Sequence, residues 1–276
     1  MEPLELVADC ARCSGLCCVA PAFARSADFA LDKPAETPCP NLRTSVPGRT
    51  DAPCGIHTEL LDRGFPGCVA FDCFGAGQRV SADWRDGPGA AREAFDAFAV
   101  LRPLHEILWY LTEPVPEADD GLRDEVTAAA RRVAGLAEGS PAGVDVGAVR
   151  AEVGELLGRV SEAVRGSAGA PGHARADLVG RDLRSGRAAR RPLAGTTLRA
   201  ALLMGADLRG VDLGRADLLG ADLRGADLRG TRLADTLFLT GPQVAAARGD
   251  ATTTRPARVP RPAAWGPAAV SATRRR

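Results

Sequence analysis

The residues with the clearest chemical potential are eight cysteines, which all lie between positions 10 and 73 of the 276-residue chain. They are Cys10, Cys13, Cys17, Cys18, Cys39, Cys54, Cys68 and Cys73. The first three are spaced closely enough for one turn of the chain to wrap an ion. Thiolates are soft ligands that select zinc or iron, usually with four ligands in a tetrahedral arrangement. Eight thiols therefore suffice for two tetrahedral sites, or for one site or cluster with spare ligands.

The expected cellular compartment decides between metal ligands and disulfide bonds. The opening residues, MEPLELVADC, lack the basic and apolar regions of a signal peptide, and no apolar run approaches the ~18 residues of a membrane span. We therefore expect a cytoplasmic protein, in which thiols stay reduced and close cysteine pairs favour metal binding. All eight cysteines are predicted to be ligands of zinc or iron, or of an iron–sulfur cluster. A disulfide framework and scattered buried thiols are the other interpretations.

The order of the cysteines adds a family resemblance. The motif Cys10-x2-Cys13-x3-Cys17-Cys18 is followed by Cys39-Pro40-Asn41-Leu42, Cys54-Gly55-Ile56-His57, Pro66-Gly67-Cys68 and Phe71-Asp72-Cys73. Residues 10–73 thereby resemble a family of zinc- or iron-chelating proteins marked by CxxCxxxCC. The chain departs from the family pattern at His57, where tyrosine is frequent, and at Gly64-Phe65-Pro66, where Arg-Pro is usual. The resemblance implies metal chelation without a particular reaction, and His57 is an additional candidate ligand.

The elements that must position these cysteines are sparse. Residues 1–85 contain many Pro and Gly and show little sustained periodicity, so they would form a small core. Such a module can draw its folding energy from the bound ion. Residues 86–165, by contrast, are predicted to form helices that pack on one another and on the cysteine module.

Three helices are expected in that region. Apolar residues recur at three- and four-residue steps from Phe95 to Leu111, more weakly over 119–138, and again from Val146 to Val164. Pro103 should kink or split the first helix, because proline has no backbone N–H to donate. Asp145 is placed to cap the third helix.

A five-residue repeat follows a change in composition. Residues 166–175, GSAGAPGHAR, are typical of a linker, and from Ala176 to Thr240 a period of five continues without a break in register. The central residue is leucine in eleven of the thirteen frames. The preceding residue is often aspartate, as at Asp177, Asp182, Asp207, Asp212, Asp217, Asp222 and Asp227. A period of five fits neither a helix nor a strand, and it favours a coil that turns a corner every five residues, with leucine inward.

The quintets ADLRG and ADLLG resemble those of the pentapeptide-repeat family, most specifically over 196–240. The resemblance implies a right-handed quadrilateral β-helix with four quintets per coil. Residues 241–249 are predicted to form a helix that caps the coil, because a solenoid needs a covered end. The predicted fold class is mixed α and β: a cysteine-rich, metal-stabilised module with helices, then a short β-helix with its cap over 176–250. Residues 251–276 are expected to be disordered.

Charge and the absent motifs limit the function. The zero net charge is the sum of −10 over residues 1–165 and +10 over 166–276, and 34 of the 35 basic residues are arginine, a bias typical of a GC-rich bacterial genome. No Walker loop, GxGxxG, HExxH or GxSxG is present, so no catalytic residue is assigned. We expect a non-catalytic adaptor that contacts a protein partner through the β-helix and has no membrane contact. The alternatives are an iron–sulfur redox protein or enzyme, and weak nucleic-acid binding through the arginine-rich tail.

Overall fold

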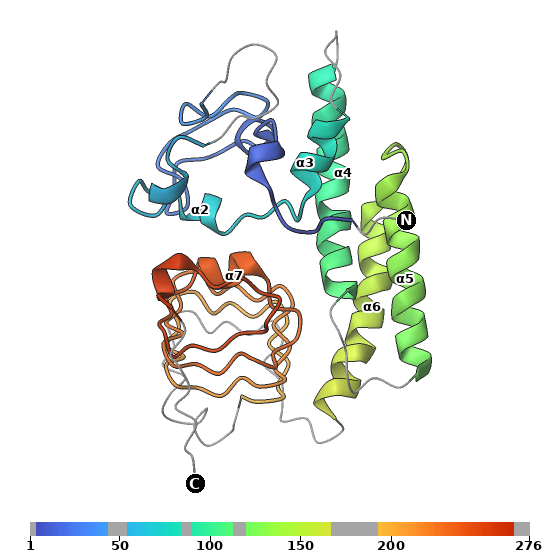
Figure 1. The fold of residues 1–276 in the computed structure, drawn as a ribbon, viewed down its shortest axis with the longest axis vertical. Coiled ribbons are helices and arrows are strands. Elements are labelled where there is room, and N and C mark those ends of the chain that lie inside the picture. The colour runs from blue at the N-terminus through green and yellow to red at the C-terminus, as the bar shows by residue number, and fades with distance from the viewer. Residues whose placement is uncertain (1–3, 44–53, 84–89, 113–119, 167–192, 268–276) are drawn as a thin grey trace. The chain divides into compact units, whose positions relative to one another are not determined.

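The computed structural model describes residues 4–43, 54–83, 90–112, 120–166 and 193–267. They divide into two compact units, and the boundary falls after Gly158 within a long helix. Each unit is described by itself (Figure 1). The predicted linker lies outside the described residues beyond Gly166, as do the repeat frames before Leu193 and the end of the tail from residue 268.

The cysteine module consists of short helical turns joined by irregular chain. The turns are η1 (Cys10–Arg12), α1 (Leu16–Val19), η2 (His57–Glu59), α2 (Pro66–Val69) and α3 (Ala76–Ala82). Local sequence sets where several of them begin, because Gly15 and Gly75 adopt a left-handed conformation before α1 and α3, and Pro66 occupies the first turn of α2. Two antiparallel bridges, Phe23 with Lys33 and Leu42 with Cys54, hold the chain between the turns.

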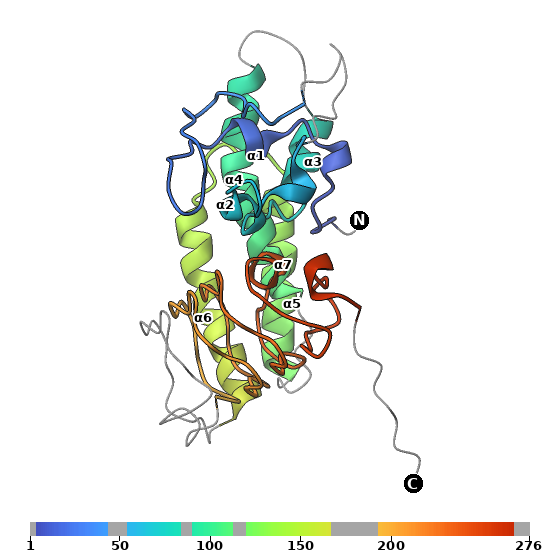
Figure 2. The same ribbon diagram turned by 90° about the vertical axis from the view of Figure 1, so that its left-hand side faces the viewer.

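Three long helices follow at the predicted places: α4 (Ala90–Leu111), α5 (Asp120–Glu138) and α6 (Val146–Arg165). Helix α4 packs against both α3 and α5, and the buried leucines of α4 include Leu104 and Leu108 (Figure 2). Asp145 caps α6 as predicted, because its Oδ1 accepts the Ala148 amide at 2.9 Å. Of the predicted kink or split at Pro103, the split does not occur, since α4 runs through the proline. None of the helices in the described part of the chain is both long and apolar enough to cross a membrane.

The second unit is a coil of stacked quintets. Parallel bridges join residues twenty apart: Thr197 with Asp217, Leu202 with Asp222, Asp207 with Asp227, Asp212 with Arg232, and Asp217 with Leu237. A spacing of twenty means four quintets per coil, as the resemblance to pentapeptide-repeat proteins implies. The contacts are isolated bridges, and no continuous sheet forms among the described residues.

The interior of the coil is made by the central leucines. Leu198, Leu203, Leu208, Leu213, Leu218, Leu223, Leu228 and Leu233 are all buried. Each repeat aspartate from Asp207 to Asp227 accepts the backbone amide two residues later, which fixes the corner. The prediction of leucine inside and aspartate at the corner is therefore confirmed, except that Asp217 is itself fully buried.

The end of the coil differs from the prediction in two respects. Helix α7 (Gly241–Ala245) begins where the capping helix was predicted but ends four residues earlier, and its residue Gln243 donates from Nε2 to the carbonyls of Leu218 and Ala221, at 2.9 Å each. Beyond it, Arg248 pairs with Asp227 and Thr254 with Arg232, so the chain resumes the coil. Residues 251–267 were expected to be disordered and are ordered instead. The reason is that Trp265 is buried against Gly249 and donates from Nε1 to the Ala247 carbonyl at 3.3 Å.

Candidate metal centre

All eight cysteines lie among the described residues, and all are free thiols. For the description of their surroundings we place them in two sets of four. Cys10, Cys13, Cys17 and Cys73 form what we call the first thiol group. Cys18, Cys39, Cys54 and Cys68 form the second thiol group. The two groups meet where Cys17 Sγ and Cys18 Sγ lie 3.9 Å apart.

Mutual repulsion shows that the first thiol group is clustered. Desolvation of the sulfur, followed by repulsion from Cys73 and Cys13, raises the pKa of Cys10 to about 11, although the residue as a whole is exposed. Burial, with Cys13 contributing, also raises the pKa of Cys73. Cys17 has a raised pKa because of its hydrogen bond with Cys18, its burial, and its repulsion from Cys18, Cys13 and Cys10. An ion that neutralised these sulfurs would remove the repulsion.

Helix α3 lies directly against two sulfurs of the first thiol group. A Cβ at Gly77 would lie 2.8 Å from Cys13 Sγ and 3.4 Å from Cys73 Sγ, so both sulfurs face the same bare backbone position. One turn later, Ser81 Oγ lies 3.7 Å from Cys13 Sγ and accepts the Ser14 amide at 2.9 Å. These contacts require small residues at positions 77 and 81 of the helix.

Helix α4 holds the turn that carries Cys73. His105 Nδ1 lies 2.8 Å from the Phe74 carbonyl, and Arg102 Nε donates to the Asp72 carbonyl at 3.1 Å. The Asp72 carboxylate accepts the Phe74 amide at 2.8 Å, and Phe74 has a positive φ of 50°. Cys73 is therefore fixed by long-range contacts from a helix thirty residues away in sequence.

The second thiol group combines two short helical turns, which carry Cys18 and Cys68, with the irregular chain that carries Cys39 and Cys54. The Cys39 amide donates to the Cys18 carbonyl at 2.9 Å, and Cys54 pairs with Leu42, whose amide donates to the Cys39 carbonyl at 2.9 Å. Burial and repulsion from Cys18, Cys39 and Cys54 raise the pKa of Cys68 to about 12. Burial likewise raises the pKa of Cys54, with Cys18 and Cys39 adding to the effect. Electrostatic interaction thus links four thiols from widely separated positions in the sequence.

The donor set suits zinc or iron in type and number, because each group offers four soft sulfurs. Within the described ranges, however, no three side chains of His, Cys, Asp or Glu converge in a geometry that could hold an ion. His57, the additional candidate ligand, is exposed at the start of η2. Metal coordination by the eight cysteines and by His57 therefore stays a prediction.

Sequence reasoning missed the residues that support the thiols. Gly77, Ser81 and His105 belong to ordinary helices and carry no motif. Lys33 is the only lysine in the chain, and this could have marked it as a residue with a special role. The arginine bias of a GC-rich genome explains the scarcity of lysine equally well, so the sequence alone does not single it out.

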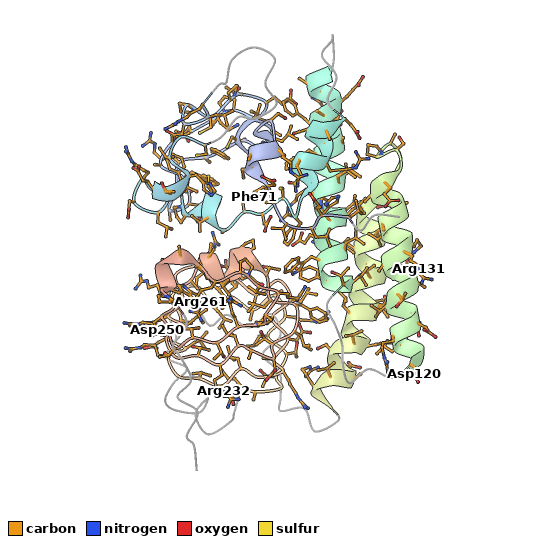
Figure 3. The ribbon with its side chains drawn as sticks, viewed as in Figure 1. Phe71, Asp120, Arg131, Arg232, Asp250 and Arg261 are labelled. Carbon is orange, nitrogen blue, oxygen red and sulfur yellow. The ribbon has the colours of Figure 1, made fainter. Side chains whose placement is uncertain are left out.

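The surface of the coil was expected to stack arginines beside neutralising aspartates. Arg209 Nη2 lies 2.8 Å from the Asp207 carboxylate, and its Nε lies 3.6 Å from that of Asp227 in the next coil. Arg229 also contacts Asp227, at 2.5 Å. Figure 3 shows Arg232 and Asp250 on the outside of this unit. The basic strip is thus largely neutralised, as the sequence predicts.

Comparison with known proteins supports the assignment of the coil. Residues 193–238 match the pentapeptide-repeat family, described as "Pentapeptide repeats", in eight copies. The chain therefore contains pentapeptide repeats. It is also similar to a solved pentapeptide repeat protein, Rfr23 of the cyanobacterium Cyanothece 51142, at 34% identity over 23% of this chain and 42% of that one, with a TM-score of 0.21.

A curated relative extends the similarity beyond the repeats. "Uncharacterized protein YybG" of Bacillus subtilis (strain 168) is 42% identical over 177 residues, which is 60% of this chain and 61% of that protein. The chain thus spans about three fifths of the length of this relative. Because 60% of the chain is much more than the stretch from residue 193 to the end, the similarity must include residues before the coil.

Proposed function

We propose that residues 10–73 bind two metal ions, zinc or iron, with one ion at each thiol group, in a non-catalytic pentapeptide repeat protein. The observation that carries this proposal is the division of eight free thiols into two sets of four, each with its own supports. A bound cation would attract each of the four thiolates and so offset the repulsion among them. It would also cross-link loops that have few buried apolar contacts of their own.

Different residues would support the ligands of each of the two ions. In the first thiol group, Gly77 leaves room for two sulfurs while Ser81 and His105 hold the flanking turns. In the second thiol group, backbone pairing of Cys39 with Cys18 and of Leu42 with Cys54 keeps three ligand segments adjacent. No step of a reaction is assigned to either group.

Metal analysis of the full chain, purified without oxygen, tests the proposal. We expect two zinc or iron ions per chain, and fewer than two overturns the proposal. Cys13→Ser should remove one ion through the first thiol group, and Cys54→Ser should remove one through the second. Colourless protein would indicate zinc, whereas a brown protein with charge-transfer absorbance would favour the iron–sulfur alternative. Unchanged metal content in both variants would contradict the assignment of the ligands.

The coil is proposed to serve as the surface for a protein partner in the cytoplasm. This rests on its rigid, regular exterior of paired Arg and Asp side chains. A partner retained by the full chain should be lost from an Arg209→Ala/Arg229→Ala variant, while Cys54→Ser should retain it. Retention by the arginine variant would contradict the placement of the contact on this face.

A further inference from the structure

The only lysine of the chain, Lys33, is buried inside the cysteine module. Its residue is 3% exposed, and its Nζ donates to the carbonyls of Val19 at 3.0 Å, Pro34 at 3.0 Å and Thr37 at 2.8 Å. The ammonium also lies 4.9 Å from the centre of the Phe23 ring. An ammonium has three N–H donors, so all of them are used. The surrounding segment is therefore folded around one positive charge.

This charge has no carboxylate partner among the described residues, since no ion pair joins Lys33 to an acidic side chain there. A buried cation is costly unless a negative charge compensates it. Two of its carbonyl partners place it beside the second thiol group, because Val19 follows Cys18 directly and Thr37 lies two residues before Cys39, whose amide donates to the Cys18 carbonyl at 2.9 Å. Cys18 and Cys39 are also the thiols that interact with it electrostatically. If these sulfurs are thiolates, they supply the missing negative charge.

The first thiol group has different surroundings. Asp72 interacts electrostatically with Cys10 and Cys73, so the nearest charged side chain on that side is negative. Arg102 opposes the charge of Asp72 from outside, where its Nε is bonded to the Asp72 carbonyl. The two groups thus have equal numbers of sulfurs and unequal electrostatic environments.

We infer that Lys33 is a charge-compensating positioning residue of the second thiol group and that it makes this group the stronger binder of a divalent ion. The inference rests on the proposed function. Four thiolates around a divalent ion carry two excess negative charges, and a buried ammonium nearby offsets one of them. The three carbonyl hydrogen bonds fix the ammonium in place, so the compensation is built into the fold.

Competition titration of the full chain with Zn²⁺ and a chromophoric chelator tests this role. Lys33→Met keeps the length of the side chain without its charge, and Lys33→Arg keeps the charge without the compact ammonium. We expect Lys33→Met to weaken one of two Zn²⁺ steps by roughly 10–100-fold, the usual cost of losing an outer partner of a metal ligand. The other step should stay unchanged and report an intact fold. Lys33→Arg should restore most of the affinity.

Two further variants identify the step and control for charge. Cys68→Ser should abolish the step that Lys33→Met weakens. Arg63→Met removes an exposed cation that pairs with Glu59 between Cys54 and Cys68, and it should change neither step. Equal affinity in Lys33→Met and wild type overturns the inference. Equal losses of Zn²⁺ affinity in Lys33→Met and Lys33→Arg, at one step or both, also overturn it. Lys33 would then act through the packing of its side chain and not through its charge.

The outcome for the wild-type chain separates this inference from the proposed function. If wild type binds fewer than two Zn²⁺ ions, the proposed function fails and the role of Lys33 fails with it. If wild type binds two and the lysine variants behave alike, only the role of Lys33 fails. Weakening in Lys33→Met with recovery in Lys33→Arg supports both.

Discussion

The coil and the cysteine module solve the problem of a small interior by different means. In the coil, a leucine enters the interior every five residues, and its neighbours above and below are the same residue type. In the cysteine module, the buried apolar side chains follow no repeat, and two thiols and a lysine are buried among them. Stability is therefore distributed along the coil, whereas in the module it depends on a few polar centres.

Buried charges show the same difference. Asp217 is fully buried in the coil, where Arg199 forms an ion pair with it and the Leu219 amide donates to it at 3.0 Å. The partner needed by this charge is thus within the same coil. The ammonium of Lys33 in the module is hydrogen-bonded by carbonyls, and among the described residues no acidic side chain forms an ion pair with it. The module is therefore the region that should respond to metal.

Removal of metal should produce the largest effect. A strong chelator is expected to unfold the cysteine module and leave the coil intact, because structural zinc sites contribute on the order of 10–16 kcal/mol in small domains. Limited proteolysis with mass spectrometry should show cleavage within residues 10–83 and protection of 193–267. Equal protection of both regions after complete metal removal would contradict the difference drawn between them.

A leucine pair tests the packing of the coil. Leu203 is fully buried and Leu202, beside it, is 41% exposed. Leu203→Ala should lower the free energy of unfolding of the coil by about 3 kcal/mol through lost burial and a cavity. Leu202→Ala should change it by less than about 0.5 kcal/mol. Denaturant titration of the full chain measures both, and similar values for the two variants would refute the repeated inward packing.

Gly77→Ala tests the contact between helix α3 and the sulfurs of the first thiol group. The new methyl would meet Cys13 Sγ at 2.8 Å, so the thiol must shift, at a cost of roughly 1–3 kcal/mol. We expect a weaker first Zn²⁺ site and an unchanged second one in the chelator titration. Gly154→Ala is the matched control, because nothing lies within 4 Å of its Cβ position in α6. Full Zn²⁺ affinity in Gly77→Ala would show that the helix does not constrain the sulfurs.

Alkaline pH should have the smallest effect, and only on metal-free protein. Folding raises the pKa of Cys10 to about 11 and of Cys68 to about 12 from an ordinary value of 9.0, so between pH 9 and 12 the unfolded chain binds fewer protons than the folded one. The stability of the module should therefore fall as pH rises through this window. Thermal melts of metal-free and metal-bound protein measure the difference. An alkaline loss of the same size with metal bound would argue against thiolate ligation.

Much of the helical and repeat structure could be predicted because its signals are local. The spacing of apolar residues located α4, α5 and α6, and the fivefold leucine located the coil. Pro103 was misjudged because tertiary packing of α4 on α3 and α5 holds the helix together despite one missing N–H donor. The order of 251–267 was missed because it depends on the fit of Trp265 against the bare backbone of Gly249, which composition does not reveal.

By itself, the sequence determined the identity of the eight thiols and the architecture of the coil, because the apolar central residue of each quintet is the one that points inward. Only the tertiary structure decided which thiols share a neighbourhood. Cys73 lies near Cys13 because both sulfurs face α3 and α4 holds the turn that carries Cys73. Lys33 lies near Cys18 and Cys39 because its ammonium donates to the carbonyls of Val19 and Thr37. In the repeat, the surroundings of each residue are set by residues close to it in the sequence or one coil away. In the cysteine module, the surroundings of each thiol are set by segments far apart in the sequence, and no local sequence pattern predicts which segments meet.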